Sequence, residues 1–137
     1  MYGLKGEVSD EEDFIISIGK GKIKREGSDV TLVAHGKMYH LAVQAANELA
    51  KDGIECEIID PRTVKPLDLD LILQSVKKTN RCIVIDEAHP FAGFAAEIGF
   101  LIQREAFDYL DAPVLRVCLP DVNAPFSKPL FDAWLPS

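Results

Sequence analysis

Three acidic residues stand where apolar stretches of the sequence end: Asp60, Asp86 and Glu87. If each stretch is a strand of one parallel sheet, these carboxylates share its carboxyl-terminal edge, where such sheets bind ligands. Carboxylates gathered there could hold a magnesium ion, as in phosphate-accepting receiver domains. Acids at strand ends more often cap the following turn or helix, so we weigh capping over a metal site by about three to one.

The three histidines do not form a recognisable metal site. His35 ends an apolar stretch and His40 falls on a predicted helix, whereas two imidazoles share a helical face at a spacing of four residues. His89 follows Asp86 by three residues, and we give a histidine and carboxylate metal site about one chance in ten. A nucleophile elbow is also absent, because Ser75 falls on a predicted helix and lacks the Gly-x-Ser-x-Gly pattern.

The stretch VIDEAHPFAGFAAEIG, residues 84–99, offers at most a weak anion site. Gly93 could let backbone N–H groups at a helix start face a phosphate. The Gly-x-Gly-x-x-Gly pattern is missing, however, and Asp86 and Glu87 would repel a phosphate placed nearby. From these residue types and spacings we assign no catalytic, cofactor-binding or metal-binding residue.

Composition narrows the class of protein. The 137 residues, 47% of them hydrophobic, suit one domain with a sizeable core. A net charge of −7 argues against nucleic acid and anionic membranes as partners and favours a basic one. Because no apolar run approaches about 20 residues and the first residues are acidic, we expect a soluble intracellular protein. Three widely spaced cysteines in apolar stretches are expected to be reduced core thiols: Cys56, Cys82 and Cys118.

Apolar periodicity predicts a doubly wound α/β fold behind an extended, acidic lead-in over residues 1–13. Strand and helix patterns alternate along residues 14–137, which predicts a mostly parallel sheet with helices on both faces. After Leu119 the sequence has four prolines and no period, so no element is predicted there. Strand patterns occupy 14–27, 29–36, 54–60, 81–88 and 112–119, and helix patterns occupy 38–53, 67–79 and 93–107.

Charge separates the expected edge strand from the central ones. Three basic residues lie within positions 22–25, a charge density that suits an edge strand and prevents pairing with other chains. The runs 30–34 and 82–85 are almost wholly apolar, which indicates central strands covered on both faces. The linker 61–68, PRTVKPLD, contains two prolines and is expected to be an ordered loop.

Several ordered motifs together resemble a known family: IGK, the Gly36 turn, IDPRTVKPLD, DEA with the Gly93 helix start, and LDAPVLRV. Their order and spacing, from about Ile18 to the end, are similar to the C-terminal domain of the β subunit of thiamine-diphosphate-dependent 2-oxo acid dehydrogenases. Pyruvate dehydrogenase looks like the nearest type. The resemblance implies a transketolase C-terminal fold, a three-layer α/β/α domain. Its mixed five-stranded sheet has one antiparallel edge strand.

The resemblance also implies a role in a larger enzyme. Thiamine diphosphate and magnesium are held in this family by an N-terminal domain and by the α subunit, and the motifs for them are absent here. We therefore expect a non-catalytic assembly and docking domain of the component that converts pyruvate to acetyl-lipoyl and carbon dioxide. Branched-chain 2-oxo acids and acetoin are alternative substrates. The implied location is the cytoplasm in a bacterium, or the mitochondrial matrix or plastid in a eukaryote.

Expected partners are the α subunit, a second β subunit or a homodimer of this chain, and the peripheral-subunit-binding domain of the lipoyl acyltransferase. Asp111 matches the family's docking acid before Ala-Pro in LDAPVLRV, and turn preferences alone make capping about equally expected. The resemblance treats Asp86, Glu87 and Gly93 as a strand-to-helix turn. It also implies an excised domain, because family members have an N-terminal half and a further C-terminal helix. An autonomous binding module and a receiver-like domain remain as alternatives.

Overall fold

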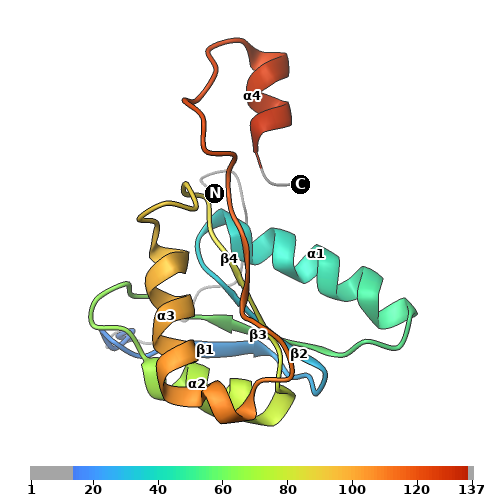
Figure 1. Cartoon of the computed structure of the whole chain (residues 1–137), viewed down its shortest axis with the longest axis vertical. Helices are drawn as coiled ribbons and strands as arrows, with labels where there is room; N and C mark the ends of the chain where they lie inside the picture. The colour runs from blue at the N-terminus through green and yellow to red at the C-terminus, as the bar shows by residue number, and fades with distance from the viewer. Residues whose placement is uncertain (1–13, 136–137) are drawn as a thin grey trace.

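A computed structural model describes residues 14–135, so the predicted lead-in 1–13 and residues 136–137 lie outside the described part. Alternating strands and helices give the three-layer α/β/α architecture expected from the periodicity (Figure 1). The elements are β1 (Lys22–Arg25), β2 (Val30–Ala34), α1 (Lys37–Lys51), β3 (Cys56–Asp60), α2 (Leu69–Thr79), β4 (Cys82–Ile85), α3 (Phe94–Ala106), a 3₁₀ turn (Phe107–Tyr109), β5 (Leu115–Val117) and α4 (Lys128–Trp134).

The five strands form one mixed sheet in the order β1-β3-β2-β4-β5. β1 runs antiparallel to β3, with Lys22 opposite Asp60, and every other neighbouring pair is parallel. The charged segment is therefore the antiparallel edge strand, as predicted. Phe14 and Ile18, in the apolar stretch before it, are exposed and lie outside any strand.

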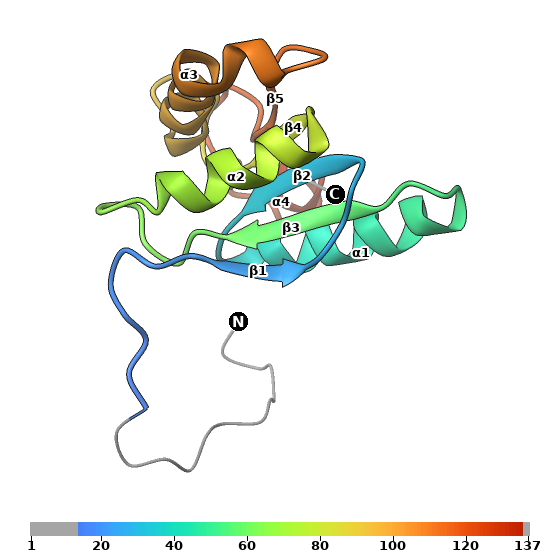
Figure 2. The ribbon, with the colours of Figure 1, turned by 90° about the horizontal axis from the view of Figure 1, so that it is seen from below.

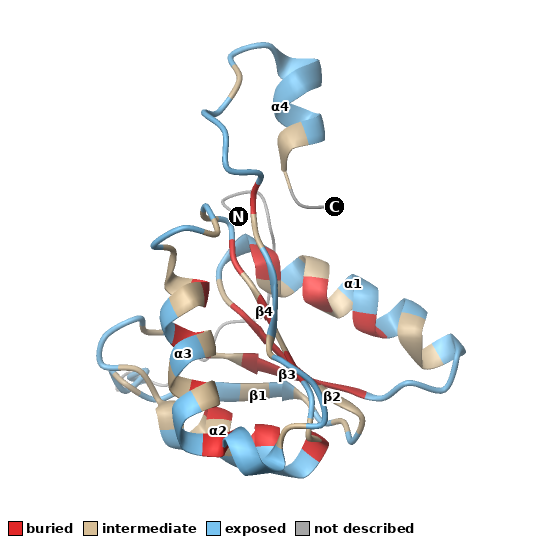
Figure 3. Ribbon diagram, in the orientation of Figure 1, coloured by how far each residue is buried: buried red, intermediate tan, exposed pale blue. Residues whose placement is uncertain are grey.

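Helices cover the two faces of the sheet unequally. Figure 2 shows α2 and α3 on one face and α1 on the other. The core under α2 and α3 includes Ile59, Ile72 and Ile98, and the core under α1 includes Met38 and Ile58, all of them fully buried (Figure 3). Each helix buries one apolar stripe, which fixes its side toward the sheet.

The prediction that residues 82–85 are covered on both faces is correct for only one face. Cys82 and Val84 point into the core under α2 and α3 and are buried. Ile83 and Ile85 point to the α1 side and are only half-buried. Covering that half of the sheet takes a second helix, and α1 packs mainly over β2 and β3.

Local sequence signals explain where the helices end. Asp68 caps α2 by accepting a hydrogen bond from the Leu71 N–H group, and Asn80 ends the helix in a left-handed conformation. α1 ends at Lys51, just before Gly53 at a φ of 79°, where the sequence predicted a left-handed cap.

The loop 61–68 is ordered, as predicted. Thr63 accepts a hydrogen bond from the N–H group of Gly19 at 3.1 Å and donates its hydroxyl to the carbonyl of Pro66 at 2.7 Å. The carboxylate of Asp68 accepts a hydrogen bond from the N–H group of Gly21 at 3.0 Å. These bonds tie the segment before β1 to the start of α2.

A buried polar seam joins α2 to the sheet. The Thr31 hydroxyl on β2 lies 2.6 Å from the Ser75 hydroxyl and 2.7 Å from the Thr79 hydroxyl, and all three residues are buried. Beside this seam Glu57 of β3, only 1% exposed, pairs with Lys78 at the end of α2. Buried polar groups that are paired in this way hold the helix in one register on the strands.

The structure contains a helix that the sequence did not predict. α4 spans Lys128–Trp134, with Pro129 in its first turn, where a missing N–H group costs nothing. The helix was missed for two reasons. Its seven residues make fewer than two turns, which is too short to show a helical period, and the segment around it contains four prolines. The helix stands at the end of an extended segment and apart from the sheet (Figure 1).

Candidate functional site

At the carboxyl-terminal edge of the sheet lie two residues that the sequence analysis considered as site candidates, His35 and Asp86. β2 and β4 are neighbours, while the helices that follow β2 and β4 cover opposite faces, so the residues after these strands lie at the topological switch point. His35 follows β2 and Asp86 follows β4. Nε2 of His35 lies 3.3 Å from Oδ1 of Asp86, yet it has no hydrogen-bond partner among residues 14–135.

Asp86 stabilises the turn that leads into α3. Its side chain is almost fully buried, and its Oδ2 accepts a hydrogen bond from the N–H group of Ala95 at 3.1 Å. Asp60 likewise accepts one from the N–H group of Arg62 at 3.0 Å, while Glu87 is exposed. The two aspartates therefore cap turns, which is the reading the sequence favoured over a magnesium site.

The described residues do not fit a metal or cofactor centre. Within residues 14–135 no group of three or more histidine, cysteine, aspartate or glutamate side chains is placed to hold a metal ion. A magnesium-bound diphosphate needs several free oxygen ligands, and the Asp86 carboxylate is buried against the start of α3.

The other histidines serve local structure. His40 lies on α1, and its ring packs edge-on against that of Tyr39. Nδ1 of His89 lies 3.1 Å from the carbonyl oxygen of Pro120, and its ring packs against that of Trp134. His89 therefore ties the loop after β4 to the segment that carries α4.

Gly93 is the residue that lets the strand-to-helix turn close. A Cβ atom at this position would lie 2.3 Å from the carbonyl oxygen of His89, a distance that carbon and oxygen cannot adopt. Gly93 directly precedes α3 in an extended conformation. In the strand-to-helix turn of Asp86, Glu87 and Gly93, Asp86 is therefore buried and Gly93 is tightly packed, whereas Glu87 is exposed.

We expect Gly93→Ala to lower the free energy of unfolding by about 1–2 kcal/mol, because the added methyl group forces the backbone of the turn apart. Gly99→Ala, six residues along on α3, is the matched control. A Cβ atom there meets its nearest neighbours at 3.9 Å, so better helix propensity should stabilise that variant by about 0.5–1 kcal/mol. Urea denaturation measures both changes in unfolding free energy. If both variants are destabilised, or both are stabilised, the close packing inferred at Gly93 is wrong.

The cysteines are free thiols, as expected. Cys56 and Cys82 are buried, whereas Cys118 lies one residue beyond β5 and is half-buried. Burial raises the pKa of the Cys82 thiol to about 12 and also raises the pKa of Cys56 and Cys118. A thiol with a raised pKa is a poor nucleophile at neutral pH.

Asp111 lies on a surface at the amino-terminal edge of the sheet, opposite the switch point. Its Oδ2 lies 3.0 Å from a guanidinium nitrogen of Arg81, and both side chains are 56% exposed. The N–H group of Asp111 donates to the carbonyl of Asn80, whose amide in turn donates to the carbonyl of Tyr109. These backbone bonds hold an exposed carboxylate on a fixed turn, so it can meet a basic partner without first being ordered.

The ion pair of Asp111 with Arg81 was not predicted from the sequence. Arg81 precedes Asp111 by 30 residues and begins the turn into β4, and only the pairing of β4 with β5 brings the two together. Next to them the Lys77 ammonium group lies 4.9 Å from the centre of the Tyr109 ring. We call Asn80, Arg81, Tyr109 and Asp111 the Asp111 surface.

Comparison with known proteins identifies relatives of the whole chain. A family profile described as "Transketolase, C-terminal domain" matches residues 19–137. The acetoin:2,6-dichlorophenolindophenol oxidoreductase subunit beta of Bacillus subtilis is 48% identical over 99% of this chain and 40% of that protein. The pyruvate dehydrogenase E1 component subunit beta of Rickettsia felis is 51% identical over 100% of this chain and 42% of that protein.

A solved structure supports the same relationship. A chain titled "Split gene transketolase, inactive beta4 tetramer" superimposes with a TM-score of 0.71 at 27% identity, over 90% of this chain and 39% of that one. This chain thus spans about two fifths of the length of the relatives that it matches. Among residues 14–135 no helix combines the length and hydropathy that crossing a membrane requires.

Proposed function

This chain belongs to the transketolase C-terminal domain family, and from that premise we propose that it is the assembly and docking region of the β subunit of a 2-oxo acid dehydrogenase. Relatives named as β subunits of pyruvate and acetoin enzymes match over nearly the whole chain, which supports a C-terminal β-subunit domain. The chain itself would bind partners and carry out no chemistry.

The enzyme proposed around this chain acts on pyruvate as the first candidate or on branched-chain 2-oxo acids as alternatives, and it would release carbon dioxide from either. Acetoin is a further alternative substrate, but it has no carboxylate and would be cleaved without decarboxylation. Thiamine diphosphate and magnesium would be held by the remainder of the β subunit and by an α subunit. Relatives from bacteria and a mitochondrial relative support a bacterial cytoplasm or a mitochondrion as the location, and the mitochondrial matrix and the plastid stay part of the proposal. A solved relative described as a β4 tetramer supports association between copies.

We assign docking to the Asp111 surface, and the single observation that carries this proposal is the exposed, pre-positioned carboxylate of Asp111. The partner would be the peripheral-subunit-binding domain of a lipoyl acyltransferase, presenting a basic side chain. That side chain would compete with Arg81 for the carboxylate. Because the existing pair is exposed to solvent, it contributes about 0–1 kcal/mol, so its exchange costs little.

A calorimetric titration with the isolated peripheral-subunit-binding domain tests this proposal. We expect saturable binding that weakens at least tenfold in Asp111→Ala, with the free energy of unfolding unchanged within about 1 kcal/mol. Asp132→Ala is the matched control. Asp132 is 55% exposed and, like Asp111, pairs with one basic side chain, here the lysine Lys128 at 2.8 Å. Equal weakening in both variants, or no loss in Asp111→Ala, would remove Asp111 from the docking surface.

A further inference from the structure

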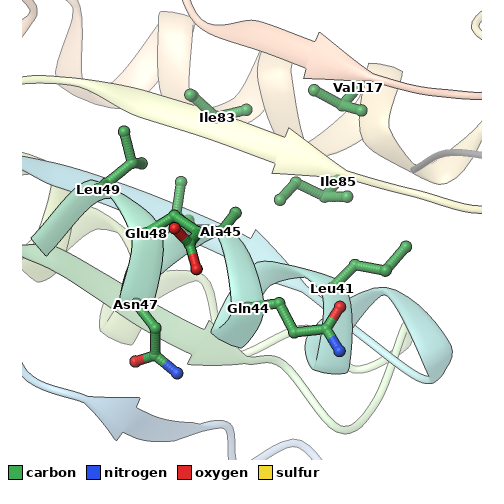
Figure 4. A pocket seen from close by; sticks show the side chains of 10 residues that line it. Leu41, Gln44, Ala45, Asn47, Glu48, Leu49, Ile83, Ile85 and Val117 are labelled. Atoms are coloured by element: carbon green, nitrogen blue, oxygen red, sulfur yellow. The ribbon is translucent and has the colours of Figure 1, made fainter. Parts of the chain in front are cut away.

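Two exposed surfaces of the described chain differ in what they can select. An open apolar groove of about 680 Å³ lies between α1 and the β4–β5 half of the sheet, and its walls include Leu41, Ile83, Ile85 and Val117 (Figure 4). Aliphatic walls accept many apolar covers and do not select one by charge. The Asp111 surface presents a carboxylate and an aromatic ring, and both groups attract cations.

A single residue, Asn80, fixes this carboxylate and this ring relative to each other. Its carbonyl accepts a hydrogen bond from the N–H group of Asp111 at 2.9 Å, and its side-chain amide donates one to the carbonyl of Tyr109 at 2.7 Å. Tyr109 is 47% exposed and the side chain of Asp111 is 56% exposed. The turn therefore holds two cation-attracting groups in a fixed relation before any partner binds.

Each of these two groups already holds a cation of the same chain. The ammonium group of Lys77, in the last turn of α2, lies 4.9 Å from the centre of the Tyr109 ring. One guanidinium nitrogen of Arg81 lies 3.0 Å from Oδ2 of Asp111. Another lies 3.5 Å from the carbonyl oxygen of Asp29, so Arg81 keeps an acceptor when it leaves the carboxylate. Both basic side chains are exposed, and contacts between exposed groups of this kind are weak enough to be exchanged.

We propose that the Asp111 surface is a two-cation site, which the chain fills with its own Lys77 and Arg81 until a partner displaces them. This inference rests on the proposed docking function and adds its regulation, because two basic residues of the chain compete with the partner. The partner that fits presents two basic side chains close together. An arginine suits the carboxylate best, since its planar guanidinium can donate two parallel hydrogen bonds. Lys77 and Arg81 therefore weaken docking, although they lie at the docking surface.

Calorimetric titration with the isolated peripheral-subunit-binding domain tests this competition by its sign. We expect Lys77→Met and Arg81→Met each to tighten binding by about three- to fivefold, because the partner no longer has to break an exposed contact. Lys128→Met is the matched control and should leave binding unchanged. Lys128 also pairs with a carboxylate, at 2.8 Å, but it lies on α4, which stands apart from the sheet (Figure 1).

Double variants test whether each cation acts through its own contact. The gain from Arg81→Met should disappear when it is combined with Asp111→Ala and should persist when it is combined with Tyr109→Leu. The gain from Lys77→Met should show the reverse pattern, because its contact is with the Tyr109 ring.

Two results would overturn the competition while docking itself stands. One is weaker or unchanged binding of the partner domain by both Lys77→Met and Arg81→Met. The other is a gain from Arg81→Met that persists in the Asp111→Ala background. A failure of the docking proposal has a different signature, because the wild-type chain and all of these variants would then show no saturable binding, and the competition would fall with it.

Discussion

Lys78→Met is expected to lower the free energy of unfolding by about 2–3 kcal/mol at neutral pH, because it leaves the buried carboxylate of Glu57 without its cation. A fully buried pair would lose about 3–5 kcal/mol, and the smaller figure reflects the 45% exposure of the Lys78 side chain. Lys77→Met is the control, since Lys77 precedes it on α2 and is exposed. The double variant Glu57→Met/Lys78→Met should recover much of the loss, because it removes the buried charge as well.

The pair of Glu57 and Lys78 makes the folding stability depend on pH. Burial raises the pKa of Glu57, but hydrogen bonds from Lys78, Ser75 and Gly27 outweigh it and hold that pKa below its usual range. This contribution to stability is therefore present above the unfolded pKa, about 4.3, and is lost as the pH falls through the folded pKa. The hydrogen bond to Glu57 raises the pKa of Lys78, so the lysine's contribution is lost only as the pH rises through its raised folded value.

In Lys78→Met the pKa shift of Glu57 is expected to change sign. Burial without a cation raises the pKa of the carboxyl group, so protonation on acidification relieves the variant while it destabilises the wild-type chain. The difference in unfolding free energy between the two proteins should narrow steadily from pH 7 to pH 4, as measured by urea denaturation. A difference that is constant over this interval would show that Glu57 and Lys78 are not coupled in the folded state.

Ile58→Ala is expected to cost about 3–4 kcal/mol, because Ile58 on β3 is fully buried under α1 and its removal leaves a cavity in a close-packed core. Ile85→Ala deletes the same atoms on the same face of the sheet, but Ile85 is half-buried beside the open groove. We expect a cost of about 1–2 kcal/mol there, scaled to the smaller area removed from water. Equal costs under conditions where the chain is monomeric would contradict the open face on β4 and β5.

Most of the fold followed from the sequence because its elements alternate and are strongly patterned. The strand and helix patterns predicted the structured segments to within a few residues at most ends. The basic run at Lys22–Arg25 predicted an edge strand, and the family resemblance implied its antiparallel direction. α4 was missed because a helix of fewer than two turns has no measurable period. The open face of β4 was missed because apolar residues on a strand do not reveal whether a helix covers both sides.

The site was less predictable because its contacts join residues far apart in the sequence. Capping by Asp86 was favoured in advance, since an acid before a glycine and a helix start is a local signal. The pairing of Glu57 with Lys78 and of Asp111 with Arg81 depends on packing between elements, which no spacing encodes. Glu57 did carry one signal, as an acid within the apolar run of β3, because buried acids need a partner.

The most direct test of the central claim is whether this chain can replace the corresponding region of a known β subunit. The pyruvate dehydrogenase β subunit of Bacillus subtilis, 48% identical over 127 residues, is the suitable host. We predict that the chimera co-purifies with the host α subunit and restores pyruvate-dependent release of carbon dioxide, whereas the host β subunit without this region does neither. A folded chimera that fails to associate with the α subunit would contradict the assembly role.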